Sequence, residues 1–151
     1  MSGVVYDSSL YIAALRLRRP DLLDLYRYGG GPLYLSSVVA QELYVGAGPR
    51  AKRRDLDQLW HRFEGVGRLL VPTANDWRET GLVLAQIGER LGYDRVRDGR
   101  LTNDALLALS ARRLGLIVVT ANVRDFDLLG RHRSFRLLPV DPQRTAERAP
   151  C

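Results

Sequence analysis

Cysteine is almost missing from this 151-residue sequence, which has a single one, Cys151, at its last position. An internal disulfide and a cysteine-rich zinc cluster are therefore excluded, and the count is typical of a reducing compartment. No apolar run approaches the ~18 residues that span a membrane. Residues 1–5 also lack the basic and long apolar regions of a signal peptide. We therefore expect a cytoplasmic protein without a membrane partner, rather than a secreted or membrane protein.

Lysine is almost missing as well: Lys52 is the only one among 23 basic residues, and the others are arginines. With 17 acidic residues the net charge is +6, and the isoelectric point is near 10.0. A basic small domain favours a polyanionic partner, because basic side chains release counterions from phosphates when they bind. Arginine suits bidentate phosphate contacts, but the same bias follows from GC-rich codon usage. The charge alone therefore does not identify the partner.

Short apolar runs alternate along the sequence with longer amphipathic stretches. The short runs predict β-strands, and apolar residues at helical spacing predict helices. This alternation is typical of an α/β fold with a mainly parallel sheet and right-handed crossovers. We predict a single domain over residues 1–141 and a C-terminal tail over 142–151. The expected strands are about 4–6, 33–35, 69–71, 116–120 and an edge strand at 135–140, and the expected helices are about 9–17, 22–28, 37–45, 51–63, 75–92 and 102–114.

Asp7 stands at the carboxyl end of the first predicted strand, Val4-Val5-Tyr6. In parallel sheets the ligand crevice lies beyond the carboxyl ends of the strands, so this position favours a functional acid. The alternative is a helix N-cap, for which aspartate is a preferred residue. Because Ser8 and Ser9 are also able to cap the helix that follows, we expect Asp7 to serve the site instead.

Glu42 and Asp104 are acidic residues within predicted helices, and each lies beside apolar positions of its own helix. The neighbours of Glu42 at helical spacing include Val38 and Val45, and those of Asp104 include Leu107. A charged side chain that faces the interior is costly unless it is paired or binds a metal. Two ordinary explanations stay open: Glu42 pairs with an arginine at the margin of its helix, and Asp104 is stabilised by the helix dipole.

Thr120, Asn122 and Asp125 follow the clearest predicted strand, residues 116–120. They stand at or beyond its carboxyl end, where they would face the same crevice as Asp7. The alternative is an Asx-turn, which asparagine and aspartate form routinely. Each acid taken alone has an ordinary explanation, but all of them fall at crevice positions. We therefore predict that four acids converge on one site: Asp7, Glu42, Asp104 and Asp125.

Such a cluster has a specific chemistry. Clustered carboxylates repel one another, which raises some of their pKa values unless a cation neutralises them. Oxygen ligands without histidine or cysteine suit Mg²⁺, with Mn²⁺ as an alternative. Such an ion orients a water, lowers its pKa and stabilises charge during in-line displacement at a phosphodiester. An acidic metal site within a basic protein therefore suits a nuclease, since arginines hold the backbone while the metal meets the scissile phosphate.

Four motifs, in this order and spacing, resemble those of the PIN domain family, and within it the VapC-type toxins of bacterial and archaeal toxin–antitoxin pairs. Any one motif is weak, but the ordered set is strong, and the resemblance covers roughly residues 3–141. The motifs are VVYDSS at 4–9, QEL at 41–43, TNDALLA at 102–108 and VTANVRDF at 119–126.

The resemblance implies a PIN-like three-layer α/β/α fold with a central, mainly parallel sheet of four or five strands. It implies a Mg²⁺-dependent endoribonuclease that cleaves RNA, forms a homodimer and is inhibited by a small cognate antitoxin whose C-terminal segment covers the site. By the matching motifs, Asp7, Glu42 and Asp104 would be catalytic acids, with Asp7 and Asp104 as metal ligands. Ser9 would be a polar support beside Asp7. For the dimer surface, the aromatic residues that we expect to be exposed are Tyr11, Tyr26 and Tyr44.

The fourth position departs from the pattern of the family. Many members place an acid two residues after the threonine, where this chain has Asn122 after Thr120. We expect Asp125 to be the fourth catalytic acid and Asn122 to orient it or a water, with Thr120 also supporting the site. Which of Asn122 and Asp125 completes the acidic site stays open at this point.

Three other functions compete with a nuclease. A phosphoacceptor receiver domain needs paired acids after the first strand and a lysine after a late strand, and Lys52 is in the wrong place. A haloacid-dehalogenase-type phosphatase needs a second aspartate two residues after Asp7, where this chain has Ser9. A non-catalytic PIN-like module that binds RNA or protein is the more serious alternative, although the presence of all the acids argues against it.

Overall fold

A five-stranded parallel sheet forms the centre of the computed structural model, which describes residues 2–26, 31–48 and 50–148. The strand order is β3-β2-β1-β4-β5, so the first and fourth strands lie side by side in the middle. This sheet confirms the α/β fold class. The strands are β1 (Val4–Tyr6), β2 (Leu33–Ser36), β3 (Leu69–Leu70), β4 (Ile117–Thr120) and β5 (Arg136–Pro139).

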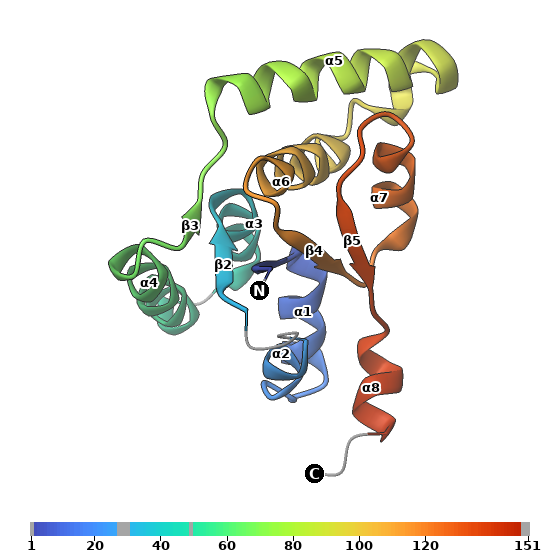
Figure 1. Cartoon of the computed structure of the whole chain (residues 1–151). Helices are drawn as coiled ribbons and strands as arrows, with labels where there is room; N and C mark the ends of the chain where they lie inside the picture. The colour runs from blue at the N-terminus through green and yellow to red at the C-terminus, as the bar shows by residue number, and fades with distance from the viewer. Residues whose placement is uncertain (1, 27–30, 49, 149–151) are drawn as a thin grey trace.

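Helices cover both faces of the sheet, as predicted for three α/β/α layers. Helices α1 and α2 lie on one side, and α5 and α6 lie on the other (Figure 1). Among the described residues, no helix combines the length and the apolar character that crossing a membrane requires. The helices are α1 (Ser8–Arg16), α2 (Leu22–Leu25), α3 (Ser37–Ala47), α4 (Arg50–Gly65), α5 (Ala74–Leu91), the 3-10 turn η2 (Tyr93–Arg95), α6 (Arg100–Arg113), α7 (Val123–Gly130) and α8 (Pro142–Arg148).

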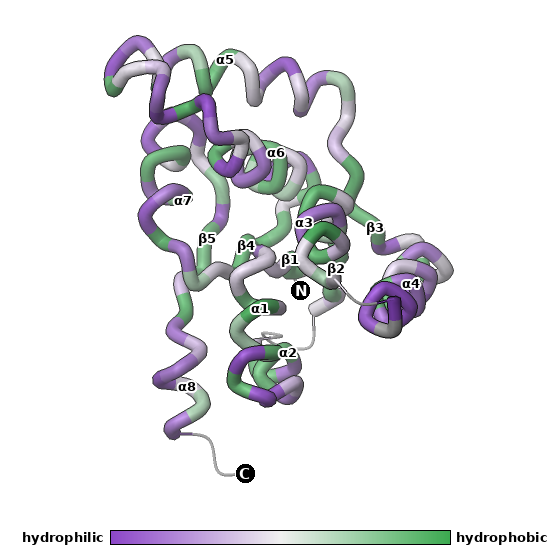
Figure 2. Tube along the Cα trace, turned by 180° about the vertical axis from the view of Figure 1, so that it is seen from behind, coloured by the Kyte–Doolittle hydropathy of each residue, from purple (hydrophilic) through white to green (hydrophobic). Residues whose placement is uncertain are grey.

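Strand β1 is apolar along its whole length because helices cover the sheet on both faces. Val4, Val5 and Tyr6 are all buried in the core. The central strands are hydrophobic and α4 is mainly hydrophilic (Figure 2). The fully apolar run at 4–6 therefore marks the middle of the sheet, where β1 pairs with β2 and β4.

Most predicted elements are present within a few residues of their expected bounds. Strand β5 lies at an edge of the sheet, which accommodates Pro139 because proline cannot donate to a ladder. The main shift is at α6, which begins at Arg100 after Gly99 in the left-handed conformation (φ 73°). Thr102 is therefore inside the helix and does not cap it. The predicted helix at 22–28 is shorter, α2 ending at Leu25, and residues 27–28 lie outside the described part.

Part of the segment expected as a tail is helical and contacts the domain. Helix α8 packs against α1 and α2. The Arg19 guanidinium donates to the carbonyl oxygen of Ala146 at 3.2 Å, and the Tyr26 hydroxyl bonds to Thr145 Oγ1 at 3.0 Å. Cys151 lies outside the described residues. Residues 142–148 are therefore an ordered part of the fold.

The expectation of three exposed aromatic residues is wrong for two of them. Tyr11 and Tyr26 are buried in the core. Tyr44 is only partly exposed, and its hydroxyl donates to Asp57 Oδ1 on α4 at 2.5 Å. Tyr11 and Tyr26 belong to the hydrophobic core cluster, whereas Tyr44 does not. Tyr11 and Tyr26 therefore do not mark a surface for a second copy.

Candidate active site

Asp7 lies just beyond the carboxyl end of β1 and is almost fully buried, with 3% of its surface exposed. Its Oδ1 accepts a hydrogen bond from the backbone N–H of Ser8 at 2.8 Å, so Asp7 is the N-cap of α1. The expectation that Asp7 is not needed as the cap is therefore wrong. Its Oδ2 accepts from Ser9 Oγ at 2.8 Å and from Thr120 Oγ1 at 2.9 Å. Capping and two hydroxyl bonds together fix the orientation of this carboxylate.

Ser9 and Thr120 are themselves held by backbone groups that follow β4. The N–H of Ala121 donates to Ser9 Oγ at 3.1 Å, and the N–H of Asn122 donates to Thr120 Oγ1 at 2.9 Å. Because these oxygens accept from the backbone, their own protons are free to point at Asp7. The ends of β1 and β4 are thereby joined around one carboxylate.

Glu42 lies on α3 and faces the same edge of the sheet. The Ser8 hydroxyl lies 3.5 Å from both Glu42 Oε2 and Asp7 Oδ1, so one proton can serve either acid. Burial raises the pKa of Glu42, and the charge of Asp7 raises it further. The Ser8 hydrogen bond and the positive charge of Arg100 oppose this rise. Among the ion pairs of the described residues none involves Glu42, so the paired-arginine explanation fails there.

Asp104 is the most perturbed acid of the group. Burial raises its pKa from 3.8 to about 8, with further contributions from Asp7, Asp125 and Glu42 and an opposing one from Arg100. Its Oδ2 is buried and has no hydrogen-bond partner within the described part of the chain. The helix-dipole explanation does not hold, because α6 begins at Arg100 and its first turn contains no acid. The interaction with Asp104 shows that all four predicted acids are electrostatic neighbours.

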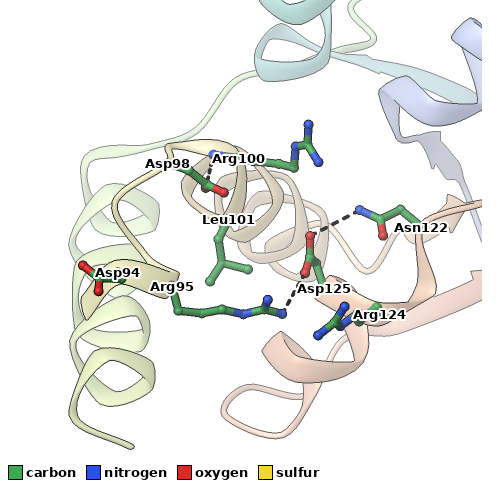
Figure 3. A pocket seen from close by; sticks show the side chains of 8 residues that line it. All are labelled: Asp94, Arg95, Asp98, Arg100, Leu101, Asn122, Arg124 and Asp125. Carbon is green, nitrogen blue, oxygen red and sulfur yellow. Dashed lines mark hydrogen bonds and ion pairs between the residues drawn. The ribbon is translucent and has the colours of Figure 1, made fainter. Parts of the chain in front are cut away.

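Two residues from the loops around α6 and α7 hold Asp125. Asn122 Nδ2 donates to Asp125 Oδ2 at 3.4 Å, and Arg95 Nη2 lies 3.3 Å from Asp125 Oδ1 (Figure 3). Asn122 is the N-cap of α7 but makes no side-chain capping bond. Its amide is therefore directed to Asp125 rather than to the helix end.

Sequence reasoning missed two residues of this site, Arg95 and Arg100. Arg95 lies in the polar stretch at 92–99, which gives no periodic pattern, and Arg100 begins a helix that the sequence places two residues later. The run of Arg and Asp residues between 94 and 100, just before the TNDALLA motif, is the one signal that points to them. Both bring positive charge to the edge of the acid cluster.

The donor set fits a hard divalent cation. All four acids offer carboxylate oxygens, and the unpartnered Oδ2 of Asp104 is a buried acceptor that a cation would satisfy. Within the described residues, no three acidic, histidine or cysteine side chains meet the geometry of a metal site as they stand. An ion held here would therefore have to draw the carboxylates toward it. Asp7 and Asp104 are the two buried acids of the set, so they are the candidate ligands.

A model of the PIN domain family matches residues 4–132, which is most of the chain. The chain belongs to the PIN domain family. The matched range contains all four acids and both hydroxyl residues around Asp7. No curated protein matches the sequence significantly.

Several solved structures share this fold. The DNA-bound VapBC structure from Salmonella typhimurium has a chain with a TM-score of 0.65 and 22% identity, covering 92% of this chain and 98% of that one. For VapBC-1 from nontypeable Haemophilus influenzae the TM-score is 0.59 and the identity 19%, covering 91% and 97%. For VapBC2 from Rickettsia felis, bound to a DNA fragment from its promoter, the TM-score is 0.58 and the identity 20%. The match covers 92% of this chain and 99% of that one. At these identities the likeness concerns the fold.

Proposed function

We propose that this PIN-domain protein is a Mg²⁺-dependent endoribonuclease that hydrolyses phosphodiester bonds in RNA. The observation that carries the proposal is Asp104, which is buried, has an unpartnered Oδ2 and has a pKa raised to about 8 beside three other acids. A divalent cation is what relieves such repulsion. Mg²⁺ suits these oxygen ligands, and Mn²⁺ is chemically able to replace it.

In the proposed site Asp7 and Asp104 hold the metal, while Ser9 and Thr120 fix the orientation of Asp7. When bound, Mg²⁺ would lower the pKa of a water molecule and stabilise negative charge at the phosphate. Glu42 has a raised pKa, which suits it to take a proton from the attacking water. Asp125 completes the acidic set, and Asn122 and Arg95 position it.

The toxin role rests on the resemblance of the motifs and on the likeness of the fold to chains of VapBC structures. We propose that the chain acts in the cytoplasm as the toxin of a toxin–antitoxin pair, bound and inhibited by a small cognate antitoxin. We also propose that it forms a homodimer. Light scattering tests this directly, since a dimer has twice the 17.0 kDa mass of one chain, and a mass of one chain at all concentrations would contradict it.

Cleavage of RNA in the presence of Mg²⁺ tests the enzymatic proposal. Wild-type protein should cleave RNA with Mg²⁺ and stop in excess chelator, whereas Asp7→Asn should be inactive with its fold intact. The proposal is wrong if RNA is cleaved at full rate in chelator, or if Asp7→Asn keeps full activity. A non-catalytic PIN-like module instead predicts RNA or protein binding without cleavage under any of these conditions.

Growth of a bacterial host tests the toxin role separately. Expression of the chain alone should arrest growth, and Asp7→Asn should relieve the arrest at equal expression. Co-expression of the product of a small neighbouring reading frame should also relieve it, as expected of an antitoxin. Equal toxicity of wild type and Asp7→Asn would count against the toxin role while leaving the RNA cleavage result in place.

A further inference from the structure

A cavity of about 430 Å³ opens beside Asp125, next to the acid cluster (Figure 3). Residues from two segments line it: the stretch from η2 to the start of α6, and the start of α7. Asp125 is the single member of the four-acid set that also lines this cavity. The cavity therefore adjoins the proposed metal site and shares Asp125 with it.

Three arginines line the cavity, and two of them have no partner in the described structure. Arg95 is held by Asp125 at 3.3 Å. Arg100 and Arg124 are exposed, and their guanidinium groups form no hydrogen bond or ion pair with any described residue. Each lies in the first turn of its helix, α6 or α7, where the helix dipole disfavours a cation. Local folding therefore does not explain why arginine occupies these two positions.

The acids that line the cavity are already engaged. Asp98 Oδ1 accepts from the backbone N–H of Arg100 at 3.0 Å. Asp94 forms an exposed pair with Arg97 at 3.4 Å, and its carboxylate points away from the cavity (Figure 3). Asp125 is bound on both oxygens, by Arg95 and by Asn122. Asp98 keeps its negative charge, but Arg100 and Arg124 are the lining guanidinium groups that no described residue binds by a hydrogen bond or ion pair.

Arg100 also connects the cavity to the acid cluster. Its positive charge opposes the raised pKa of both Asp104 and Glu42, so its guanidinium lies within electrostatic reach of the two acids. An anion bound by Arg100 would lie next to the site where a phosphodiester is to be cut. A nuclease needs such a contact, because a chain held at one phosphate only is not fixed in register.

We propose that Arg100 and Arg124 each bind a phosphate of the RNA backbone near the scissile phosphate, with Arg95, fixed by Asp125, as the third cation of this subsite. The proposal rests on the nuclease function proposed above and adds to it the path of the substrate. RNA leaves the acid cluster across the start of α6 and α7, over the cavity. Guanidinium groups suit this task because they bind phosphate oxygens in a fork.

Binding of a short fluorescent single-stranded RNA in excess chelator tests the subsite without cleavage. The double variant Arg100→Ala/Arg124→Ala should bind at least about tenfold more weakly than wild type, as the loss of charged hydrogen bonds implies. The plot of log affinity against log salt concentration should become shallower by about 1.4, at about 0.7 for each of two phosphate contacts to a single strand. With Mg²⁺ present, the double variant should raise KM more than it lowers kcat.

Arg112→Ala is the matched control. Arg112 is an exposed arginine of the same helix, about 18 Å from Arg100 along the axis at 1.5 Å per residue. It should keep the affinity and the salt dependence of wild type. Both arginines of the double variant are exposed, so its thermal unfolding should match that of wild type.

Failure of the phosphate subsite can be distinguished from failure of the proposed nuclease function. Equal affinity and equal salt dependence for wild type and the double variant would overturn the subsite, as would an equal loss in Arg112→Ala. Wild-type protein that binds RNA through Arg100 and Arg124 but never cleaves it with Mg²⁺ would overturn the nuclease function instead. Wild-type protein that binds no RNA would overturn both.

Discussion

Asp7 combines a structural task with its place in the acid cluster. It caps α1 through Oδ1, and Ser9 and Thr120 donate to Oδ2. Asparagine caps a helix as well as aspartate does, whereas alanine does not. The choice of replacement therefore decides whether a variant tests the chemistry or the fold.

Asp7→Asn should change the free energy of unfolding little, because its amide oxygen keeps the capping bond and the two hydroxyls can accept from its amide nitrogen. Asp7→Ala should lower the free energy of unfolding by at least about 1 kcal/mol, the cost of a lost N-cap. Urea denaturation of the two variants checks this. Equal destabilisation by asparagine and alanine would mean that the capping bond contributes nothing.

The raised pKa of Asp104 predicts a pH dependence of stability. The folded protein holds a proton on Asp104 up to about pH 8, whereas the unfolded chain loses it near 3.8. Between these values the folded state binds more protons, so the free energy of unfolding should fall as pH rises through this range in metal-free buffer. Asp104→Asn has no carboxyl proton to lose, so its free energy of unfolding should fall much less over this range. The pKa of Glu42 is also raised, and Glu42 accounts for the fall that remains. Denaturation at several pH values measures it.

Asp94→Asn is the control for this prediction, because Asp94 is exposed and lies outside the acid cluster. It should keep the pH dependence of wild type. A wild-type protein whose stability rises steadily from pH 5 to 8 would contradict the raised pKa.

At the scale of single residues, the sequence identified the acids better than their surroundings. Asp7 and Asp125 were candidates because they follow strands, and Glu42 and Asp104 because they lie beside apolar helix positions. Arg95 and Arg100 were missed, since an arginine in a polar stretch looks like any solvated residue of a basic protein. The capping role of Asp7 was missed because Ser8 and Ser9 are equally good caps by residue type.

Helix α5 is attached to the rest of the domain by side-chain bonds at its start. Asp76 accepts from the Thr73 backbone N–H at 2.9 Å and from Arg113 Nε at 3.1 Å, completing a capping box and an ion pair. Arg133 also pairs with Glu79 at 3.1 Å. These bonds place α5 over α6, and α5 in turn leads into the segment that carries Arg95.

Asp76→Ala should lower the free energy of unfolding by about 2 kcal/mol, because it removes the capping-box bond to the Thr73 backbone N–H and a partner of Arg113 in one change. Asp94→Ala removes an ion pair whose carboxylate is 98% exposed, so it should have no measurable effect. Thermal or urea unfolding of both variants compares them. The interpretation of α5 fails if the two variants are equally stable.

At the scale of elements, the strands were predictable because short apolar runs bounded by turns have few alternatives. The ends of the helices were less predictable from the sequence than the strands. The start of α6 depends on Gly99 in the left-handed conformation, and glycine adopts that conformation without a sequence pattern to mark it. Helix α8 was not expected either, because its polar sequence has no apolar stripe and is held by contacts with Arg19 and Tyr26 from far along the chain.

The whole molecule carries a net charge of +6, while the charges of Asp7, Glu42 and Asp125 all act on the buried Asp104. The strand order makes this possible: β1 and β4 are neighbours, and the backbone N–H of Asp7 donates to the carbonyl of Val119 at 3.0 Å. Local patterns predicted which residues follow each strand. The pairing of β1 with β4 depends on the crossovers of the whole chain, so local patterns did not predict that the two strands are neighbours.

The initial rate of Mg²⁺-dependent RNA cleavage by wild type, Asp104→Asn and Asp94→Asn tests the acid cluster as the site of chemistry most directly. Asp104→Asn should lose at least about a hundredfold in rate, because the proposed Mg²⁺ would lose one of its two ligands. Asp94→Asn should cleave at the wild-type rate, since its carboxylate lies away from the cluster. A wild-type rate for Asp104→Asn, with its fold confirmed, would contradict the placement of the chemistry at these acids.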